Sequence, residues 1–266
     1  MARTASLMDQ LRAIYGSHLQ ENVCMANYTT VHVGGLADGL LIVHTAGELE
    51  ETVRQLWALN APFYILGSGS NVLFSDRGLR GVVIINRAKT VKIDVHTAPP
   101  TVWVESGANL GALARQVALR GLSGLEWAAT IPGTVGGAVY GNAGAHGGDM
   151  ASNLVLAEIL HRKKGRETWK GEQMAFDYRT STLKRTPAEA VILAARLQLT
   201  FSTPAEVQAR MEEFAAKRRR TQPPGASLGS MFKNPPGDYA GRLIEAAGLK
   251  GTRIGGAIIS NVHANF

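Results

Sequence analysis

Glycine is concentrated in two stretches of the chain, and glycine-rich turns can hold phosphate groups. Nine of the 30 glycines fall within residues 121–148, and a second cluster, Gly67-Ser68-Gly69-Ser70-Asn71, follows a short apolar run. Because glycine lacks a Cβ and adopts positive φ at little cost, its backbone N–H groups can surround an anion. Together the two stretches predict a pair of turns that bind a pyrophosphate. The alternative is that both are tight turns between strands.

Two common phosphate-binding motifs do not match these glycines. The 67–71 cluster lacks the third glycine of the dinucleotide fingerprint, and the residues after it do not read as a helix. No Gly-Lys-Ser/Thr sequence of a Walker A motif occurs in the chain. The turns are therefore predicted to belong to another nucleotide-binding fold.

The chain is basic, which raises nucleic acid as a partner. Its 28 Lys and Arg against 21 Asp and Glu give a formal net charge of +7. The positive residues are spread along the chain, apart from one run at Lys217–Arg220. That run falls at the end of a predicted helix, where the helix dipole stabilises cations. We therefore expect no nucleic-acid partner, and a basic nucleic-acid-binding module is the alternative from another class.

Other counts exclude whole classes of site. The single cysteine, Cys24, rules out a disulfide framework and a cysteine-built zinc site, and the seven histidines lack metal-ligand spacing, so no metal is predicted. No apolar run is long enough to cross a membrane, and the N-terminus does not read as a signal peptide. We expect a cytoplasmic protein without membrane contact.

Strand and helix signals alternate in the first part of the chain. Residues 40–44 and 63–66 read as strands around a helix over 48–59 that Thr45 caps, which predicts a β-α-β unit with a parallel strand pair. Further strands are predicted at 81–86, 90–95, 101–105, 155–161 and 190–200, with a helix over 109–120. The pattern is that of an α+β fold with mixed sheets.

A strong helix start marks the last part of the chain. Thr203-Pro204-Ala205-Glu206 combines a capping threonine, proline at the first helical position and glutamate three residues after the cap. The helix is predicted to end near Arg219, ahead of Pro223-Pro224. We place a domain boundary near residue 201. Residues 1–200 then form one domain, with subdomains of about 1–86 and 87–200, and residues 201–266 form a second.

Several motifs, in this order along the chain, resemble those of the UDP-N-acetylenolpyruvoylglucosamine reductase family. They are NYTTVHVGG (27–35), LGSGSNVL (66–73), IPGTVGGAVYGNAGAHG (131–147), FDYRTS (176–181), GSMFKNP (229–235), AGRLIEAAGLKG (240–251) and HANF (263–266). The resemblance covers nearly the whole chain. The short separation of Arg179 from Ser230 is similar to the shorter subtype, which lacks an inserted loop carrying a substrate-clamping tyrosine.

The resemblance implies a fold, a cofactor and a reaction. The fold is the two-subdomain FAD-binding fold of the vanillyl-alcohol-oxidase type, with a C-terminal α+β domain that binds substrate. FAD is held non-covalently, and NADPH is the co-substrate. The reaction reduces the enolpyruvyl group of UDP-N-acetylglucosamine-enolpyruvate to give UDP-N-acetylmuramate for peptidoglycan synthesis. A monomer is implied as well. The runner-up among enzymes is another FAD oxidoreductase of this fold with a different acceptor.

The resemblance also assigns roles to individual residues. Hydride addition at C3 of the enolpyruvyl group develops negative charge at C2 and its carboxylate, which needs a fixed cation and then a proton. Arg179 matches the family's electrophilic arginine and Ser230 its proton donor, with Lys233 as a candidate to polarise the serine. Without the motif, Arg179 would read as a surface ion-pair residue and Ser230 as a turn residue.

The remaining site residues are carried over from the same motifs. The expected cofactor-binding residues are Gly67, Ser68, Gly69, Ser70, Asn71, Pro132, Gly133, Thr134, Gly136, Gly137, Gly141, Asn142 and Ala143. The expected substrate-binding residues are Tyr178, Lys233, Asn234, Lys250 and His263. Two roles are possible for four of the motif residues, either contact with substrate or cofactor or support of the fold. They are Asn234, Lys250, His263 and Asn265.

One family feature has no counterpart in the motifs. The family chain continues past HANF through a further helix and strand that carry a catalytic glutamate, and no position here matches it. Either residues follow Phe266 in the natural chain, or another acid or water assists Ser230. The role is not transferred to Glu126 or Glu245.

Overall fold

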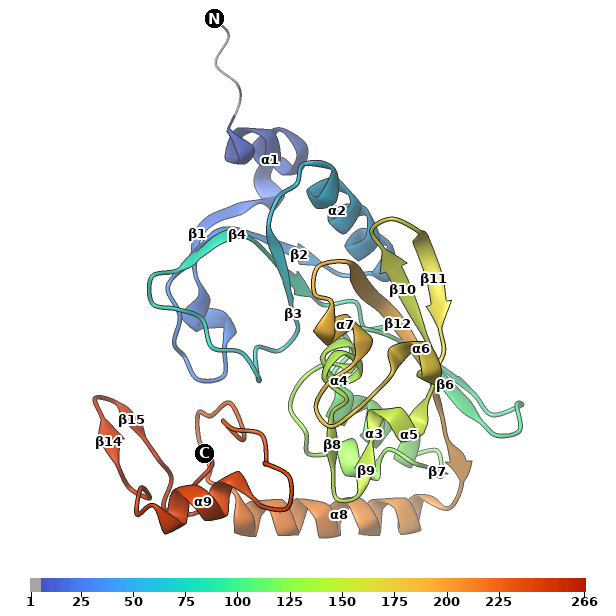
Figure 1. The fold of residues 1–266 in the computed structure, drawn as a ribbon. Helices are drawn as coiled ribbons and strands as arrows, with labels where there is room; N and C mark the ends of the chain where they lie inside the picture. Colours follow the sequence, from blue (N-terminus) through green and yellow to red (C-terminus); the bar gives the residue numbers. More distant parts are fainter. Residues whose placement is uncertain (1–5) are drawn as a thin grey trace, which may run out of the picture.

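The computed structural model describes residues 6–266 and contains two main sheets (Figure 1). The first has the strand order β1-β2-β4-β3, formed by β1 (Gln20–Cys24), β2 (Leu36–Val43), β4 (Leu79–Asn86) and β3 (Phe63–Leu66). β2, β4 and β3 run parallel, and β1 pairs antiparallel with β2. The buried faces of β2 and β4 make up much of the core of this unit.

The predicted β-α-β unit is present, with one correction. Helix α2 (Ala46–Ala58) joins β2 to β3 and begins at Ala46 rather than Glu48, because Thr45 caps it by accepting a hydrogen bond from the Glu48 N–H. The predicted strand pair is not a direct one, since β4 lies between β2 and β3 and pairs with both. Local sequence predicts the crossover helix but not which later strand fills the gap.

The second sheet is antiparallel throughout. Its order is β11-β10-β12-β6-β5, built from β11 (Gly165–Trp169), β10 (Leu154–His161), β12 (Ala190–Gln198), β6 (Thr101–Glu105) and β5 (Val91–Asp94). The strand predicted over 190–200 ends at Gln198. Thr200–Phe201 forms a separate strand, β13, that pairs with β7 (Leu122–Ser123) instead.

Short helices and hairpins cover the second sheet. They are α3 (Leu110–Ala118), α4 (Val135–Gly141), α5 (Met150–Asn153), α6 (Gly171–Met174), α7 (Thr182–Arg185), the 3-10 turn η3 (Glu126–Ala128) and the hairpin β8 (Gly144–Ala145) with β9 (Gly148–Asp149). The helix predicted over 109–120 is α3, which begins at Leu110, because Asn109 caps it from outside, and ends at Ala118. These elements and the sheet enclose the largest buried cluster of the molecule, which includes Leu113, Val139 and Leu197.

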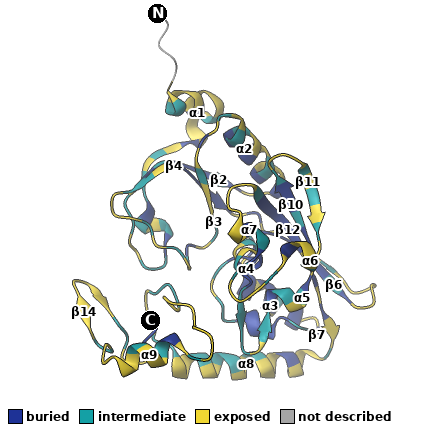
Figure 2. Cartoon of the chain, viewed as in Figure 1, coloured by how far each residue is buried: buried dark blue, intermediate teal, exposed yellow. Residues whose placement is uncertain are grey.

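The two sheets share buried side chains. Leu160, Val191 and Leu193 of the second sheet belong to the same cluster as Val43 and Val82 of the first. The buried carboxylate of Glu105, at the end of β6, adds a polar link by accepting hydrogen bonds from the N–H groups of Ala46 and Thr90, each at 2.8 Å. The sheets therefore form one continuous body, and its dark blue buried segments lie mainly in the strands and in the helices packed on them (Figure 2).

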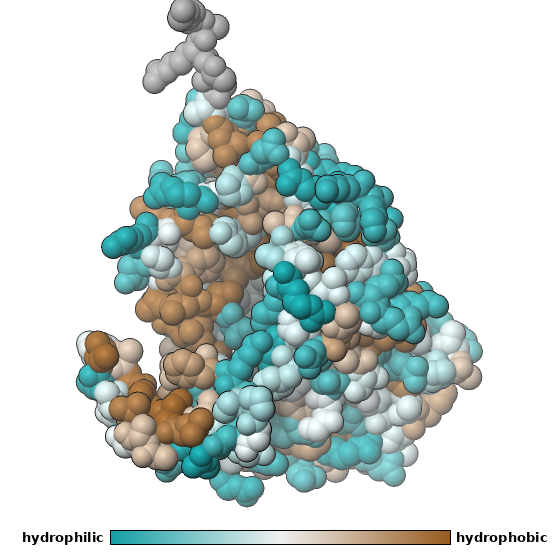
Figure 3. All heavy atoms as spheres, in the orientation of Figure 1, coloured by the Kyte–Doolittle hydropathy of each residue, from teal (hydrophilic) through white to brown (hydrophobic). Residues whose placement is uncertain are grey.

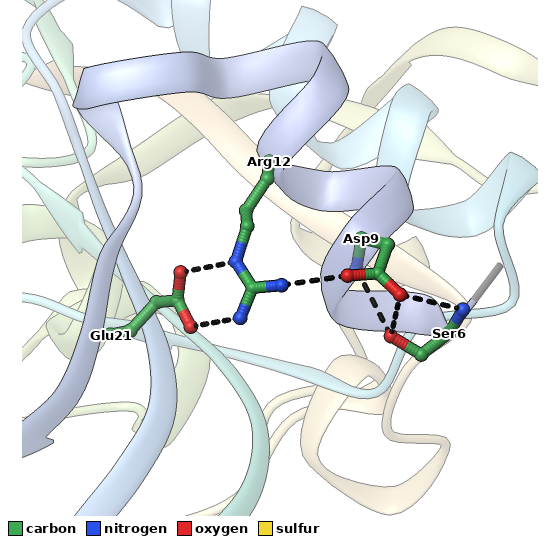
Figure 4. Close-up of polar contacts among 4 residues, drawn as sticks. All are labelled: Ser6, Asp9, Arg12 and Glu21. Atoms are coloured by element: carbon green, nitrogen blue, oxygen red, sulfur yellow. Dashed lines mark hydrogen bonds and ion pairs between the residues drawn. The ribbon is translucent and has the colours of Figure 1, made fainter.

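Helix α1 (Leu7–Tyr15) is fixed to β1 by ion pairs (Figure 4). The Arg12 guanidinium donates two hydrogen bonds to Glu21, at 2.7 and 2.8 Å, and one to Asp9 at 2.7 Å. Ser6 and Asp9 form a capping box at the start of the helix. The Arg12 hydrogen bond lowers the pKa of Glu21, and the bond from Ser6 contributes most to lowering that of Asp9. Leu11 anchors the helix in the core.

Helix α8 (Pro204–Thr221) connects this body to the C-terminal residues. The predicted start is confirmed, with Thr203 and Glu206 forming a capping box around Pro204, and the helix ends at Thr221 rather than Arg219. α8 runs along the base of the body (Figure 1), where Val207 is buried and Arg210 pairs with the buried Glu126 at 3.0 Å. Glu126 thus has a structural partner.

The C-terminal residues form a small, open unit. They contain α9 (Ala240–Ala246) and the hairpin β14 (Arg253–Ile254) with β15 (Ala257–Ile258), and most of them are exposed (Figure 2). Within residues 222–266, only Ala240, Ala264 and Asn265 are buried. The division into domains at residues 86 and 201 stays a prediction. No helix formed by residues 6–266 has both the length and the apolar character to cross a membrane.

Candidate functional site

The two glycine turns predicted from the sequence meet in the structure. The first follows β3 and the second precedes α4, and the Ser70 hydroxyl donates a hydrogen bond of 3.1 Å to the Pro132 carbonyl between them. A Cβ on Gly67 would overlap the side chain of Thr134, and one on Gly133 would lie 3.2 Å from Ser70 Oγ. Glycine at these positions lets the two turns approach each other closely.

A third segment packs against the first turn. Gly69 has a φ of +65°, and a Cβ there would overlap the Tyr28 carbonyl oxygen. The Gly69 carbonyl accepts a hydrogen bond of 3.1 Å from the Thr30 N–H. The Thr30 hydroxyl also donates to the Ser227 carbonyl at 2.9 Å, which ties the C-terminal residues to the same point. Three distant stretches of chain therefore converge here.

These segments line a pocket of about 600 Å³. Its size is within the range of about 300–1,000 Å³ that small-molecule sites occupy. The lining comes from residues 27–32, both glycine turns, the ends of β4 and β6 and the loop after α8. It consists of Asn27, Tyr28, Thr29, Thr30, His32, Gly67, Ser68, Ile85, Asn86, Arg87, Gly107, Thr134, Gly225 and Ala226. Of the residues assigned from the sequence, Gly67, Ser68 and Thr134 are in this lining.

Sequence reasoning missed most of the pocket wall. Asn27–Thr30 and His32 lie within NYTTVHVGG, a motif that carried the resemblance but received no site residue. Ile85 and Asn86 are the last residues of the parallel strand β4 and Arg87 follows it, and ligands commonly bind beyond the carboxyl ends of parallel strands. That rule was the signal that could have found them.

Other residues assigned to the cofactor have partners within the protein. The Gly136 N–H donates to the Ser106 carbonyl at 2.7 Å. Asn142 is buried and left-handed, and its side-chain amide donates to the Asp177 carbonyl at 3.2 Å and accepts from the Ala151 N–H at 3.0 Å. Asn71, at the end of the first turn, is exposed, and Thr134 caps α4 by accepting a hydrogen bond from the Gly137 N–H. Gly141 has no neighbour within 4 Å of an added Cβ, and Ala143 donates to Ala138.

The pocket fits the dinucleotide that the resemblance implies. Within residues 6–266, the N–H groups of Ser68 and Gly69 have no hydrogen-bond partner, so both can donate to phosphate oxygens. The Thr130 hydroxyl lies just before the second turn. It is buried and has no hydrogen-bond partner within residues 6–266. An unpaired buried hydroxyl is costly unless a ligand or water satisfies it. Arg87 adds a positive charge to the wall.

The two residues expected to act on substrate lie on exposed loops. Arg179 has a left-handed backbone with a φ of +57°, and its guanidinium donates to the Gly144 carbonyl at 3.0 Å. Ser230 is on the loop after α8, and its side chain has no hydrogen-bond partner within residues 6–266. The Asn234 N–H donates to the Tyr178 hydroxyl at 3.4 Å, which joins the Arg179 segment to the Ser230 segment.

A second pocket, of about 550 Å³, opens at that junction. It is lined by Tyr178 and by residues 234–239 ahead of α9. Asp238 and Arg242 form an ion pair at its edge, and the hydrogen bond from Arg242 lowers the pKa of Asp238 to about 2. Figure 3 shows apolar side chains over the first sheet and over the C-terminal unit, with a hollow between them.

Lys250 and His263 have partners within the C-terminal unit. The Lys250 ammonium pairs with Glu245 at 2.7 Å. The His263 ring contacts Phe266 edge-on, with centroids 4.8 Å apart, and its Nδ1 accepts from the Asn265 N–H. These residues stabilise the unit that carries the Ser230 loop.

Asn265 fixes the loop directly. Its amide accepts a hydrogen bond of 2.9 Å from the Phe232 N–H and donates one of 2.8 Å to the Phe232 carbonyl, while its own carbonyl accepts from Met231. Asn265 is buried, so these bonds are shielded from water. It therefore positions the backbone beside Ser230.

Replacing Asn265 with alanine is expected to loosen the 229–234 loop without unfolding the body. Loss of both side-chain hydrogen bonds should cost about 1–3 kcal/mol of local stability. Hydrogen–deuterium exchange by mass spectrometry should show faster exchange in 229–234 and unchanged exchange in β10 and β12. Gln208, an exposed amide side chain on α8, replaced by alanine, is the control. Unchanged exchange in the loop would contradict this role.

His146, in the β8–β9 hairpin, joins that hairpin to α8. Its ring stacks on Phe214 with centroids 4.4 Å apart and planes 2° from parallel. Burial lowers the pKa of His146, as do the nearby charges of Lys217 and Arg218, and Glu213 opposes them. Within the Lys217–Arg220 run, Arg218 is the partly buried residue, and burial lowers its pKa.

The His146 contact predicts a pH-dependent stability. Because the pKa of His146 is lower in the folded state, the neutral ring stabilises the fold. Its contribution to the free energy of unfolding is complete above the ordinary pKa of 6.5 and is lost as the pH falls. The melting temperature should fall more for the wild type than for His146→Phe between about pH 7.5 and about pH 5.5. Phenylalanine keeps the stack but cannot titrate. If the melting temperatures of the two proteins fall in parallel with pH, His146 does not contribute to the pH dependence of stability.

Comparison with known proteins agrees with this arrangement. A family profile described as "FAD binding domain" matches residues 37–169, and one described as "UDP-N-acetylenolpyruvoylglucosamine reductase, C-terminal domain" matches residues 221–266. UDP-N-acetylenolpyruvoylglucosamine reductase from Chloroflexus aggregans is 43% identical over 253 residues, which cover 93% of this chain and 84% of the relative. The Bacillus subtilis enzyme of the same name is 42% identical over 247 residues, covering 92% and 80%.

Solved structures give the same result. The crystal structure of UDP-N-acetylenolpyruvylglucosamine reductase from Thermus caldophilus is similar with a TM-score of 0.79 and 40% identity, covering 92% of this chain and 85% of that one. Alkyldihydroxyacetonephosphate synthase has a TM-score of 0.55 at 16% identity, covering 76% and 42%, and shares the fold alone. The predicted FAD-binding fold is therefore confirmed, and the chain belongs to the UDP-N-acetylenolpyruvoylglucosamine reductase family.

Proposed function

We propose that this protein uses NADPH to reduce the enolpyruvyl group of UDP-N-acetylglucosamine-enolpyruvate, giving UDP-N-acetylmuramate. The observation that carries the proposal is the continuity of the two sites. Gly225 and Ala226 line the pocket at the glycine turns, and the same loop continues to Ser230 and to the Tyr178–Asn234 contact. Membership of the reductase family over nearly the whole chain gives the reaction.

Residues of the first pocket would hold FAD without a covalent bond. The two glycine turns, with the residues assigned from the sequence, supply backbone N–H groups to the pyrophosphate, and Ser68 and Gly69 have such groups unpaired. Asn27–Thr30 and Arg87 extend this set. When bound, FAD carries hydride from NADPH to C3 of the enolpyruvyl group.

The protein's own side chains handle charge and proton. Arg179 is proposed to stabilise the negative charge that develops at C2 and its carboxylate, and its guanidinium is held by the Gly144 carbonyl. Ser230 is proposed to deliver the proton to C2, for which its hydroxyl is exposed and unpaired within residues 6–266. Lys233, three residues further on, would polarise that hydroxyl.

Tyr178 and Asn234, which line the second pocket, are proposed to contact the substrate, together with Lys233, the residue before Asn234. Lys250 and His263 complete the set assigned from the sequence. Both have internal partners, Glu245 and Phe266, so they would reach the substrate only by exchanging them.

A spectrophotometric assay tests the function. The purified protein should be yellow, and NADPH oxidation should require UDP-N-acetylglucosamine-enolpyruvate. A colourless protein that FAD cannot reconstitute would rule the proposal out. Flavin loading with NADPH oxidation that ignores this substrate would favour another FAD oxidoreductase of the same fold.

We further propose that the protein acts as a cytoplasmic monomer without nucleic acid. Its substrates are small anions, and the positive charge that first suggested nucleic acid suits FAD, NADPH and a UDP-sugar equally well. Light scattering should give the monomer mass. A steeply salt-dependent interaction with DNA or RNA would contradict the proposal.

A further inference from the structure

We infer that Lys184, a residue that none of the sequence motifs singled out, binds the carboxylate of the substrate's enolpyruvyl group together with Arg179. This rests on the proposed function. Lys184 has a rigid support in α7, contacts Arg179 directly, and belongs to a group of cations without acidic partners.

Lys184 is held on a fixed element. Ser181 is fully buried, its hydroxyl donates to the Tyr140 carbonyl at 2.7 Å, and it accepts the Lys184 N–H at 3.3 Å to cap α7. The adjacent Leu183 is buried in the main core. The base of the Lys184 side chain therefore has little freedom, although its end is exposed.

The Lys184 ammonium group contacts the backbone that presents Arg179. It donates a hydrogen bond of 3.1 Å to the Arg179 carbonyl. The turn is closed by two backbone bonds between Asp177 and Thr180, and Arg179 adopts its left-handed conformation within it. Left-handed backbone is unfavourable for a residue with a Cβ and persists where its surroundings hold it. Lys184 thus lies beside Arg179 and supports the turn.

Three cations gather here without an acidic partner. Neither Arg179, Lys184 nor Lys233 forms an ion pair within residues 6–266. Asp177, in the same turn, accepts the Tyr178 N–H at 2.6 Å. Burial is the main cause that lowers the pKa of Lys184, and the nearby charges of Lys233 and Arg179 lower it further. Such a cluster repels itself until an anion binds, so it forms a receptor for a carboxylate.

The carboxylate is favoured over the diphosphate because Arg179 is the residue proposed to act on it. Two ligands distinguish binding of the carboxylate from binding of the diphosphate. Both contain the diphosphate, but UDP-N-acetylmuramate carries the carboxylate and UDP-N-acetylglucosamine does not. Lys184→Met should weaken the binding of UDP-N-acetylmuramate at least tenfold and that of UDP-N-acetylglucosamine less than twofold. Calorimetry on the FAD-loaded protein measures both affinities. Lys184→Arg should keep binding within about threefold.

A third variant separates charge from support of the turn. Lys184→Gln retains a hydrogen-bond donor for the Arg179 carbonyl but has no charge, so it should behave like Lys184→Met. Lys163→Met, on an exposed hairpin away from the site, is the matched control and should bind both ligands normally. Flavin content and melting temperature are measured for every variant.

Each result bears on the inference. Equal weakening of both ligands would assign Lys184 to the diphosphate, and wild-type binding by Lys184→Gln would reduce it to a structural donor, so either overturns the inference. An unchanged Lys184→Met would do the same. A failure of the wild type to load FAD or to reduce the enolpyruvyl substrate would instead overturn the proposed function.

Discussion

Replacing Gly69 with alanine is expected to remove FAD from the protein and to destabilise it. The added Cβ would overlap the Tyr28 carbonyl oxygen, a backbone atom that cannot move aside as a side chain can. The φ of +65° adds the cost of left-handed backbone to this overlap. Strain and overpacking together should cost about 2–4 kcal/mol. Flavin absorbance per protein and the melting temperature after reconstitution measure both effects.

Another glycine gives the control for Gly69. Gly171, at the start of α6, has no atom within 4 Å of an added Cβ, so Gly171→Ala should retain flavin and melt like the wild type. If Gly69→Ala also loads FAD normally, the close approach of Tyr28 to the first turn is not needed for the cofactor site.

Replacing Ser230 with alanine is expected to separate the two halves of the reaction. NADPH should bleach the flavin absorbance at the normal rate, because Ser230 is proposed to act only on the enolpyruvyl substrate. The return of absorbance on adding that substrate should slow by about a hundredfold to ten-thousandfold, the usual range for loss of a general acid. Stopped-flow absorbance follows both phases in one instrument.

Ser227 lies in the same loop and provides the comparison for Ser230. Its hydroxyl accepts the Gly229 N–H at 3.3 Å, so Ser227→Ala tests any general loosening of the loop. Equal slowing of both phases in Ser230→Ala, or equal slowing in Ser227→Ala, would argue against the proton-donor role.

Local elements of the fold could be predicted well from the sequence. Thr45 and Thr203 each cap the helix expected of them, because capping depends on residues only a few positions apart. The position of β4 between β2 and β3 could not be predicted, since strand order depends on contacts across the chain. The break after Gln198 arises in the same way, from the pairing of Phe201 with Leu122.

The site was predictable by residue type but not by contact. The two glycine turns were predicted to act as a pair, but only the fold shows the contact between them, in which the Ser70 hydroxyl bonds to the Pro132 carbonyl. Tyr178 and Asn234 are far apart in sequence and meet only in the structure. Lys184 was missed because a lysine near other basic residues gives no pattern of its own until its neighbour, Arg179, is known to adopt a left-handed turn.

The cluster shared by the two sheets governs how the molecule comes apart. Neither sheet can separate without exposing Leu160, Leu193 and Val82 to water and breaking the hydrogen bond from the Ala46 N–H to the Glu105 carboxylate. The body should therefore melt as one cooperative unit. The C-terminal unit, with few buried side chains, can open locally at a much lower free-energy cost. Proteases would then cut the loop that carries Ser230 first, and substrate bound there would slow the cleavage.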